Sequence, residues 1–213
     1  FGVPFAVALF FYMLIIISSN QMLTAISKEK ENRMIEVLLS SAKPMDLFLG
    51  KVFARGLATV LQATVWLGTI LLISKLNNTA FTLPFELSLS PKLLIFGLPF
   101  FVGGFMLFGS LLAGMGAMAQ NTREGNQYMM MINAPLIIAY ISINQIIASP
   151  TSPLTTFLSL FPLTSPVVIP TRIAIGILPT WQLLGSLAIL LITMLLVMRD
   201  RKSTRLNSSH ITI

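Results

Sequence analysis

The sequence predicts an all-α protein, a polytopic transmembrane helical bundle. Hydrophobic residues make up 55% of the 213 residues and charged residues only 10%, whereas a typical soluble domain carries about 25% charged residues. Five long apolar runs each approach the roughly 20 residues that a helix needs to cross a bilayer. Because a chain of this size cannot bury five such helices on all sides, lipid is the expected solvent.

The five expected spans belong to one transmembrane domain, residues 1–200. They cover residues 1–19, 52–74, 93–119, 128–148 and 180–198. The chain begins at Phe1 inside an apolar run, so we expect it to be truncated at its N-terminus. The last stretch, 201–213, changes abruptly to polar residues and resembles a vector- or adapter-derived translation, so we interpret it as a non-native tail; a genuine disordered tail is the alternative.

Lys and Arg are distributed unequally between the loops, which predicts the orientation of the chain. Basic residues are enriched in the short cytoplasmic loops of membrane proteins. One side would carry eleven of the fourteen: Lys28, Lys30, Arg33, Lys43, Lys51, Arg55, Arg123, Arg199, Arg201, Lys202 and Arg205. The other side would carry Lys75, Lys92 and Arg172. The fragment is therefore expected to start outside and end in the cytoplasm, and its net charge of +7 does not require a nucleic-acid partner.

Several classes of chemistry are disfavoured by composition. The chain has no Cys, and its single His, His210, lies in the polar tail, so neither a Cys-ligated metal nor a His-based catalytic triad is expected. The pair Gly50-Lys51 resembles the end of a P-loop, but Met45 and Val52 stand where that motif needs Gly and Ser or Thr. We therefore predict no cofactor and no nucleotide-binding site in this chain.

The segment between the first two spans has the pattern of a short charged helix followed by an elbow. Apolar residues recur at helical spacing from Met34 to Leu39, and charged residues occupy most of the other face. Ser27 is a candidate N-cap for this helix, and Pro44 suits the first turn of the next one. A helix of this kind either presents a face to a soluble partner or is a solvated amphipathic connector.

Two strings of this sequence resemble a known family. The first is Glu29-Lys-Glu-Asn-Arg-Met-Ile-Glu-Val-Leu-Leu-Ser-Ser41, followed by Pro44 and Leu49-Gly-Lys51; the second is Phe161-Pro-Leu-Thr-Ser-Pro-Val-Val-Ile-Pro-Thr-Arg172. Both are similar to segments of ABC-2 type transporter permeases, and most of all to the sodium-extrusion, NatB-like branch. The resemblance covers roughly residues 1–200.

This resemblance implies a function, a partner and a set of site residues. The chain would be the permease subunit of an ABC exporter in a bacterial or archaeal plasma membrane, paired with a second permease subunit as a homodimer or heterodimer. A separate ABC ATPase subunit would hydrolyse ATP and drive alternating access. The family has six spans, so a sixth would precede Phe1. The cytoplasmic coupling helix would contact the ATPase through Glu29, Glu31, Arg33, Glu36, Leu38 and Leu39, with Lys51 at the membrane boundary.

Polar and small residues inside the predicted spans are candidates for pathway lining or helix packing. Polar side chains in a membrane usually face the protein interior, and small residues let helices approach closely. The candidates are Gln62, Gly109, Ser110, Gly114, Asn133 and Asn144. Interhelical packing and hydrogen bonding are the simpler interpretation, and a dimer interface or a substrate route is the alternative.

The Pro-rich stretch 149–179 contains apolar strings, which predicts short re-entrant or interfacial helices on the extracytoplasmic side. Broken backbone at membrane depth is tolerated only where protein covers it. Two other functions, an intramembrane enzyme and an ion-coupled carrier, are the alternatives. An intramembrane enzyme would need a buried catalytic constellation, and an ion-coupled secondary carrier would need intramembrane acids or internal repeats; none of these is found in the sequence.

Overall fold

The computed structural model describes residues 2–31, 44–76, 90–119 and 122–208. Within these ranges the regular structure is helical throughout, which confirms the predicted fold class. The helices are α1 (Gly2–Glu31), α3 (Pro44–Leu76), α4 (Pro91–Met118), α5 (Thr122–Ile141), α6 (Ile143–Ala148), α7 (Pro153–Leu160), α8 (Ser165–Ile175) and α9 (Thr180–Ser208).

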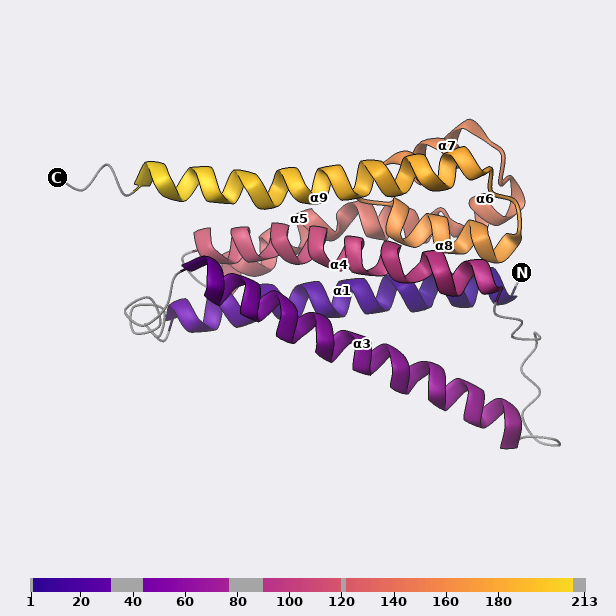
Figure 1. Ribbon diagram of the computed structural model, residues 1–213, viewed down its shortest axis with the longest axis horizontal. Coiled ribbons are helices and arrows are strands. Elements are labelled where there is room, and N and C mark those ends of the chain that lie inside the picture. Colours follow the sequence, from indigo (N-terminus) through magenta and orange to yellow (C-terminus); the bar gives the residue numbers. More distant parts are fainter. Residues whose placement is uncertain (1, 32–43, 77–89, 120–121, 209–213) are drawn as a thin grey trace.

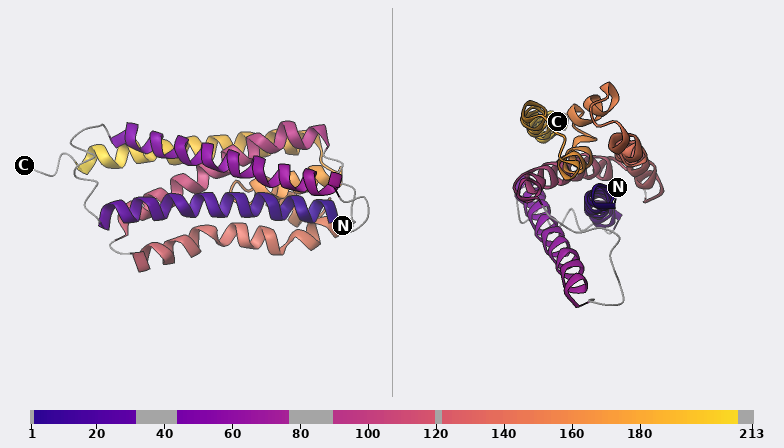
Figure 2. Two further views of the ribbon diagram at one scale, coloured as in Figure 1. Left: turned by 90° about the horizontal axis from the view of Figure 1, so that it is seen from below. Right: turned by 90° about the vertical axis from the view of Figure 1, so that its right-hand side faces the viewer.

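Four of the helical stretches are long and apolar enough to cross a membrane. They are Gly2–Lys28, Pro91–Met118, Arg123–Ala148 and Thr180–Arg199, and they coincide with four of the five predicted spans. Helix α3 covers the remaining predicted span, 52–74, which stays a prediction because part of its side chains lies outside the described residues. The long helices run roughly side by side (Figures 1 and 2).

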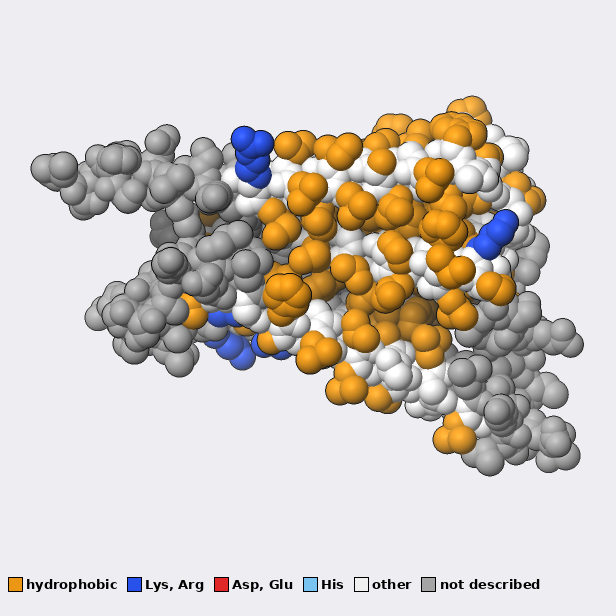
Figure 3. Space-filling view, in the orientation of Figure 1, with side chains coloured by type: hydrophobic (Ala, Val, Ile, Leu, Met, Phe, Trp, Pro, Cys, Tyr) orange, Lys and Arg blue, Asp and Glu red, His pale blue; other side chains and the backbone are white. Residues whose placement is uncertain are grey.

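The bundle has two distinct ends. We call one the basic end: here α1 finishes at Glu31, α3 begins at Pro44, and α9 runs toward the C-terminus (Figure 1). The opposite end holds the N-terminus and the short helices α6, α7 and α8. Figure 3 shows the basic side chains of one face near these two ends, with a largely apolar band between them. A band of this kind is what a bilayer-spanning surface requires.

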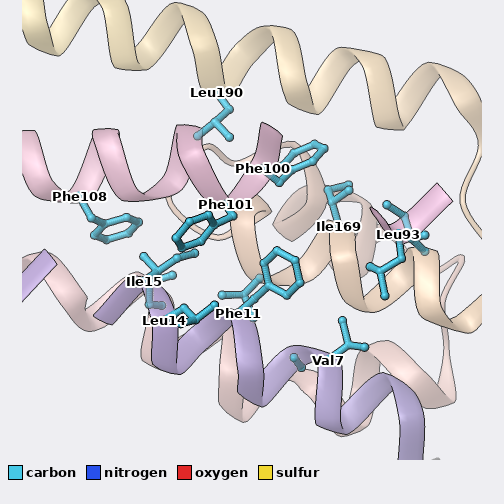
Figure 4. Close-up of a cluster of buried hydrophobic side chains, with 14 of the residues drawn as sticks. Val7, Phe11, Leu14, Ile15, Leu93, Phe100, Phe101, Phe108, Ile169 and Leu190 are labelled. Carbon is cyan, nitrogen blue, oxygen red and sulfur yellow. The ribbon is translucent and has the colours of Figure 1, made fainter. Parts of the chain in front are cut away.

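Helices α1 and α4 form the centre of the bundle. They pack along each other, and both also contact α3, α5 and α8, while α9 packs on α4. Aromatic and aliphatic side chains of α1 and α4 interdigitate with residues of α8 and α9 (Figure 4). The core residues labelled in that view are Val7, Phe11, Leu14, Ile15, Leu93, Phe100, Phe101, Phe108, Ile169 and Leu190.

Helix α1 corrects one expectation from the sequence. Ser27 is not an N-cap, because α1 runs without interruption from Gly2 to Glu31 and buries Ser27 inside its last turns. Helix α3 does begin at Pro44, as predicted. The coupling helix predicted between the first two spans stays a prediction, because residues 32–43 lie outside the described residues.

Three short helices fill the stretch between α5 and α9. Helix α7 begins with a Ser152 cap, whose hydroxyl accepts a hydrogen bond from the Thr155 amide at 3.2 Å. Helix α8 ends at Ile175 and is capped by Gly176, whose φ of 84° favours glycine. Every residue of α8 from Ser165 to Ile173 is buried. Protein therefore covers this broken backbone, the condition under which such backbone persists at membrane depth.

Candidate functional site

The predicted coupling residues lie on both sides of residues 32–43 at the basic end or within this range, which is outside the described residues. Glu29 and Glu31 lie on the last turn of α1, but their side chains are outside the described residues, as are Arg33, Glu36, Leu38 and Leu39 altogether. Lys51 is described: it lies on the second turn of α3 and is half-buried. The two described residues that bracket the segment, Glu31 and Pro44, both lie at the basic end (Figure 1).

A hydrogen bond between two amide side chains links α1 to α5. The Asn133 side-chain Nδ2 donates to Asn20 Oδ1 at 2.8 Å, and Asn133 is only 4% exposed. Its own Oδ1 atom and the hydroxyls of Ser18 and Ser19 are buried without a protein hydrogen-bond partner. A buried polar atom without a hydrogen bond costs free energy. The polar side chains around Ser18 and Ser19 are therefore not explained by the packing of α1 alone.

A polar recess lies between α1 and α3 toward the basic end. It has a volume of about 450 Å³ and is lined by Ile17, Asn20, Gln21, Thr24, Ala25, Lys28 and Arg55. The Arg55 Nη1 donates to Gln21 Oε1 at 3.3 Å across the two helices. Two cationic side chains and three uncharged polar ones thus meet here, and the described lining contains no Asp or Glu. Such a lining suits an anion or an uncharged hydrogen-bonding group.

The other predicted pathway or packing residues are dispersed. Gln62 is half-buried on α3, whereas Asn144 is exposed on α6. Ser110 is buried, and its hydroxyl donates to the Met106 carbonyl of its own helix at 2.5 Å. The structure brings Asn133 together with Asn20, but it does not bring these six candidates into one cluster.

Close helix contacts occur at different glycines from those singled out in the sequence. A Cβ at Gly104 would lie 2.6 Å from Pro166 Cβ, and one at Gly103 would lie 2.9 Å from Leu190 Cδ2. A Cβ at Gly109 would meet only Phe105 of the same helix, at 3.8 Å, and Gly114 is half-buried. The roles proposed for Gly109 and Gly114 therefore stay predictions.

A buried cation that sequence reasoning did not place among the site residues joins the short helices α7 and α8 to the start of the long helix α9. Arg172 of α8 is 1% exposed. Its Nη1 donates to Ser159 Oγ of α7 at 2.8 Å and to Gln182 Oε1 of α9 at 2.5 Å. An arginine side chain stays protonated in proteins, so this buried guanidinium is charged.

This arrangement favours a structural role for Arg172 over contact with lipid headgroups. The sequence gives one sign of this buried polar cluster, because Gln182 is a polar residue inside the last apolar run. Pairing it with Ser159 and Arg172 required knowledge of how the short helices fold back. Among the described residues there is no group of three or more His, Cys, Asp or Glu side chains that could hold a metal ion.

The fold and the apolar surface define an integral membrane protein built as a polytopic helical bundle. The family described as "ABC-2 family transporter protein" matches residues 3–198, and the chain belongs to this family. The described helices therefore form the membrane domain of an ABC-2 family transporter protein.

Two curated relatives are similar over nearly the whole chain. One is an uncharacterised protein, MJ1024, of Methanocaldococcus jannaschii, 26% identical over 193 residues that cover 91% of this chain and 46% of the relative. Another is the uncharacterised protein YhaP of Bacillus subtilis, 24% identical over 206 residues that cover 92% of this chain and 48% of the relative. The chain thus spans about half the length of these relatives. No solved structure matches it.

Proposed function

We propose that this chain is the membrane-spanning part of an ABC exporter, and that it moves substrate outward by alternating access. Membership of the ABC-2 transporter family over residues 3–198 is the observation that carries the proposal. The coupling residues are Glu29, Glu31, Arg33, Glu36, Leu38, Leu39 and Lys51. A second permease subunit, identical or different, completes the pathway, and the transporter belongs to the sodium-extrusion branch of a bacterial or archaeal plasma membrane.

The charge distribution supports the orientation that this function needs. Among the described basic residues, Lys28, Lys51, Arg55, Arg123 and Arg199 lie toward the basic end, whereas Lys92 and Arg172 lie toward the opposite end. By the positive-inside rule the basic end is cytoplasmic. The segment between Glu31 and Pro44 then faces the compartment that holds ATP and the ATPase.

Energy transfer through this segment requires that the ATPase bind two conformations of the permease with different affinities. ATP binding closes the ATPase dimer, and this closure shifts the permease only if the ATPase binds one conformation of the bundle more tightly than the other. Helices α1 and α3 flank the coupling segment, and α3 diverges from the rest of the bundle along its length (Figure 1). A displacement of the segment is therefore transmitted first to these two helices.

The test is co-purification of the full-length protein with its ABC ATPase subunit. Replacement of Glu31, Glu36 and Leu38 by alanine is expected to abolish or strongly weaken the association and the ATPase stimulation. The matched control replaces Lys92 and Trp181, exposed residues at the opposite end, by alanine. It is expected to leave association with the ATPase unchanged. Association that persists in the first variant would contradict the proposed coupling role of these residues, and failure of the unaltered protein to bind any ABC ATPase would favour an ion-coupled carrier.

A further inference from the structure

We propose that the recess between α1 and α3 is a binding site for the phosphate headgroup of an anionic phospholipid from the leaflet at the basic end. The first observation is charge. Lys28 of α1 contributes an ammonium and Arg55 of α3 a guanidinium to the lining, and the described lining holds no carboxylate. Arg and Lys are the side chains that bind phosphate oxygens best.

The second observation is depth. Lys28 is the last residue of the apolar stretch Gly2–Lys28 that is long enough to cross a membrane, so its ammonium lies at the headgroup level. Ile17 borders the same recess and lies eleven residues earlier on α1, or about 16 Å deeper at 1.5 Å per residue. A recess that begins among headgroups and ends at hydrocarbon depth fits a phosphate that carries an acyl chain.

The third observation is access. The recess is an open hollow between two helices rather than an enclosed cavity, and α3 diverges from the rest of the bundle toward its own C-terminal end, beyond the contact of Trp66 with Phe10 (Figure 1). A lipid can therefore enter the recess laterally from the bilayer without breaking any described contact. A free phosphate ion would use the two cations but would leave the apolar part of the recess, at Ile17 and Ala25, unoccupied.

Occupancy of this site would connect the two helices that flank the coupling segment. Across the described part of the recess, α1 and α3 are joined by the single hydrogen bond between Gln21 and Arg55. A phosphate bound by Lys28 and Arg55 adds charge-assisted hydrogen bonds between the same two helices. Lipid binding itself does not depend on the proposed exporter function, and its test needs no ATPase.

The test measures binding of fluorescent phosphatidylglycerol to the purified full-length protein in a neutral detergent. The variant Lys28→Gln/Arg55→Gln is expected to weaken binding by about a hundredfold, at about tenfold for each lost charge-assisted hydrogen bond. The matched control Arg123→Gln/Arg199→Gln removes two exposed cations from the basic end outside the recess and should change binding less than about twofold. The variant Lys28→Arg retains the charge and should retain binding.

Three results would overturn the proposal. Equal losses in the recess and control variants would mean that only general surface charge attracts the lipid. Equal affinity for phosphatidylcholine would mean that the anionic headgroup is not recognised. Displacement of the lipid by inorganic phosphate at comparable concentration would assign the site to a soluble anion. Because Lys28 is exposed and Arg55 half-exposed, both variants should fold, and an unchanged elution profile in gel filtration checks this.

Discussion

Gly104→Ala is expected to destabilise the bundle, because it inserts a methyl group where α4 packs against Pro166 of α8. The new Cβ would lie 2.6 Å from Pro166 Cβ, 2.9 Å from Pro166 Cγ and 3.1 Å from Ile15 Cδ1. Carbon atoms normally pack at about 3.5–4.0 Å, so α8 would have to move by about 1 Å. The proline ring cannot rotate away as a flexible side chain could.

The expected magnitude combines two opposing effects. Overpacking of a well-packed core costs about 1–3 kcal/mol, and replacing a mid-helix glycine with alanine recovers about 0.5–1 kcal/mol. The net loss is about 1–2 kcal/mol, which for a chain of this size lowers the melting temperature by roughly 2–8 °C. The assay is thermal unfolding of the purified protein in detergent, followed by gel filtration of the soluble fraction.

Gly109→Ala is the matched control on the same helix, since its Cβ would meet only Phe105 at an ordinary 3.8 Å. It should leave the melting temperature unchanged or slightly higher. In a Pro166→Gly background the penalty of Gly104→Ala should shrink, because the clashing ring is gone. A Gly104→Ala protein that melts with or above the Gly109→Ala protein would refute this packing of α4 against α8.

Three further outcomes are expected. Gln182→Leu removes an acceptor from the buried Arg172 guanidinium and should lower the free energy of unfolding by about 1–3 kcal/mol. The double variant Gln182→Leu/Arg172→Met should recover part of this loss, because no cation is left buried. Thermal unfolding measures both, and a double variant less stable than Gln182→Leu would refute the reasoning. Asn133→Leu removes one interhelical hydrogen bond and should cost less than about 2 kcal/mol, so a loss above about 3 kcal/mol would show a larger structural role. The chain has no Cys, so single substitutions can map its orientation: a membrane-impermeant maleimide should label Thr79→Cys but not Ser41→Cys in intact cells, and the reverse pattern would invert the topology.

The positions of the long helices could be predicted from the sequence because they depend on local properties. Run length and hydropathy locate spans, and Pro44 begins α3 because proline suits a first helical turn. The prediction of Ser27 as a cap was wrong, since continuous α1 packing overrides a local capping preference. The interruption of the fourth predicted span at Ser142, between α5 and α6, also left no clear mark in the sequence.

The site could be predicted only in part, because contacts between helices depend on their rotation and tilt. The sequence marks a glycine-rich α4, but the neighbours of α4 determine that Gly104 rather than Gly109 touches another helix. Similarly, Arg172 and Gln182 are ten residues apart, and they meet only because α8 folds back beside the start of α9. Asn133 was recognised as a polar residue inside a span, but its partner Asn20 was not.

The central claim is that the segment after α1 contacts a separate ATPase in the cytoplasm. It is tested most directly with Leu38→Cys as the only cysteine of the full-length chain, co-expressed with the ABC ATPase and treated with a short cysteine-to-lysine cross-linker. The account predicts a covalent adduct with the ATPase at this position and none from Ser90→Cys at the opposite end. Absence of the adduct at Leu38→Cys in a complex that still co-purifies, or an equal adduct at Ser90→Cys, would contradict it.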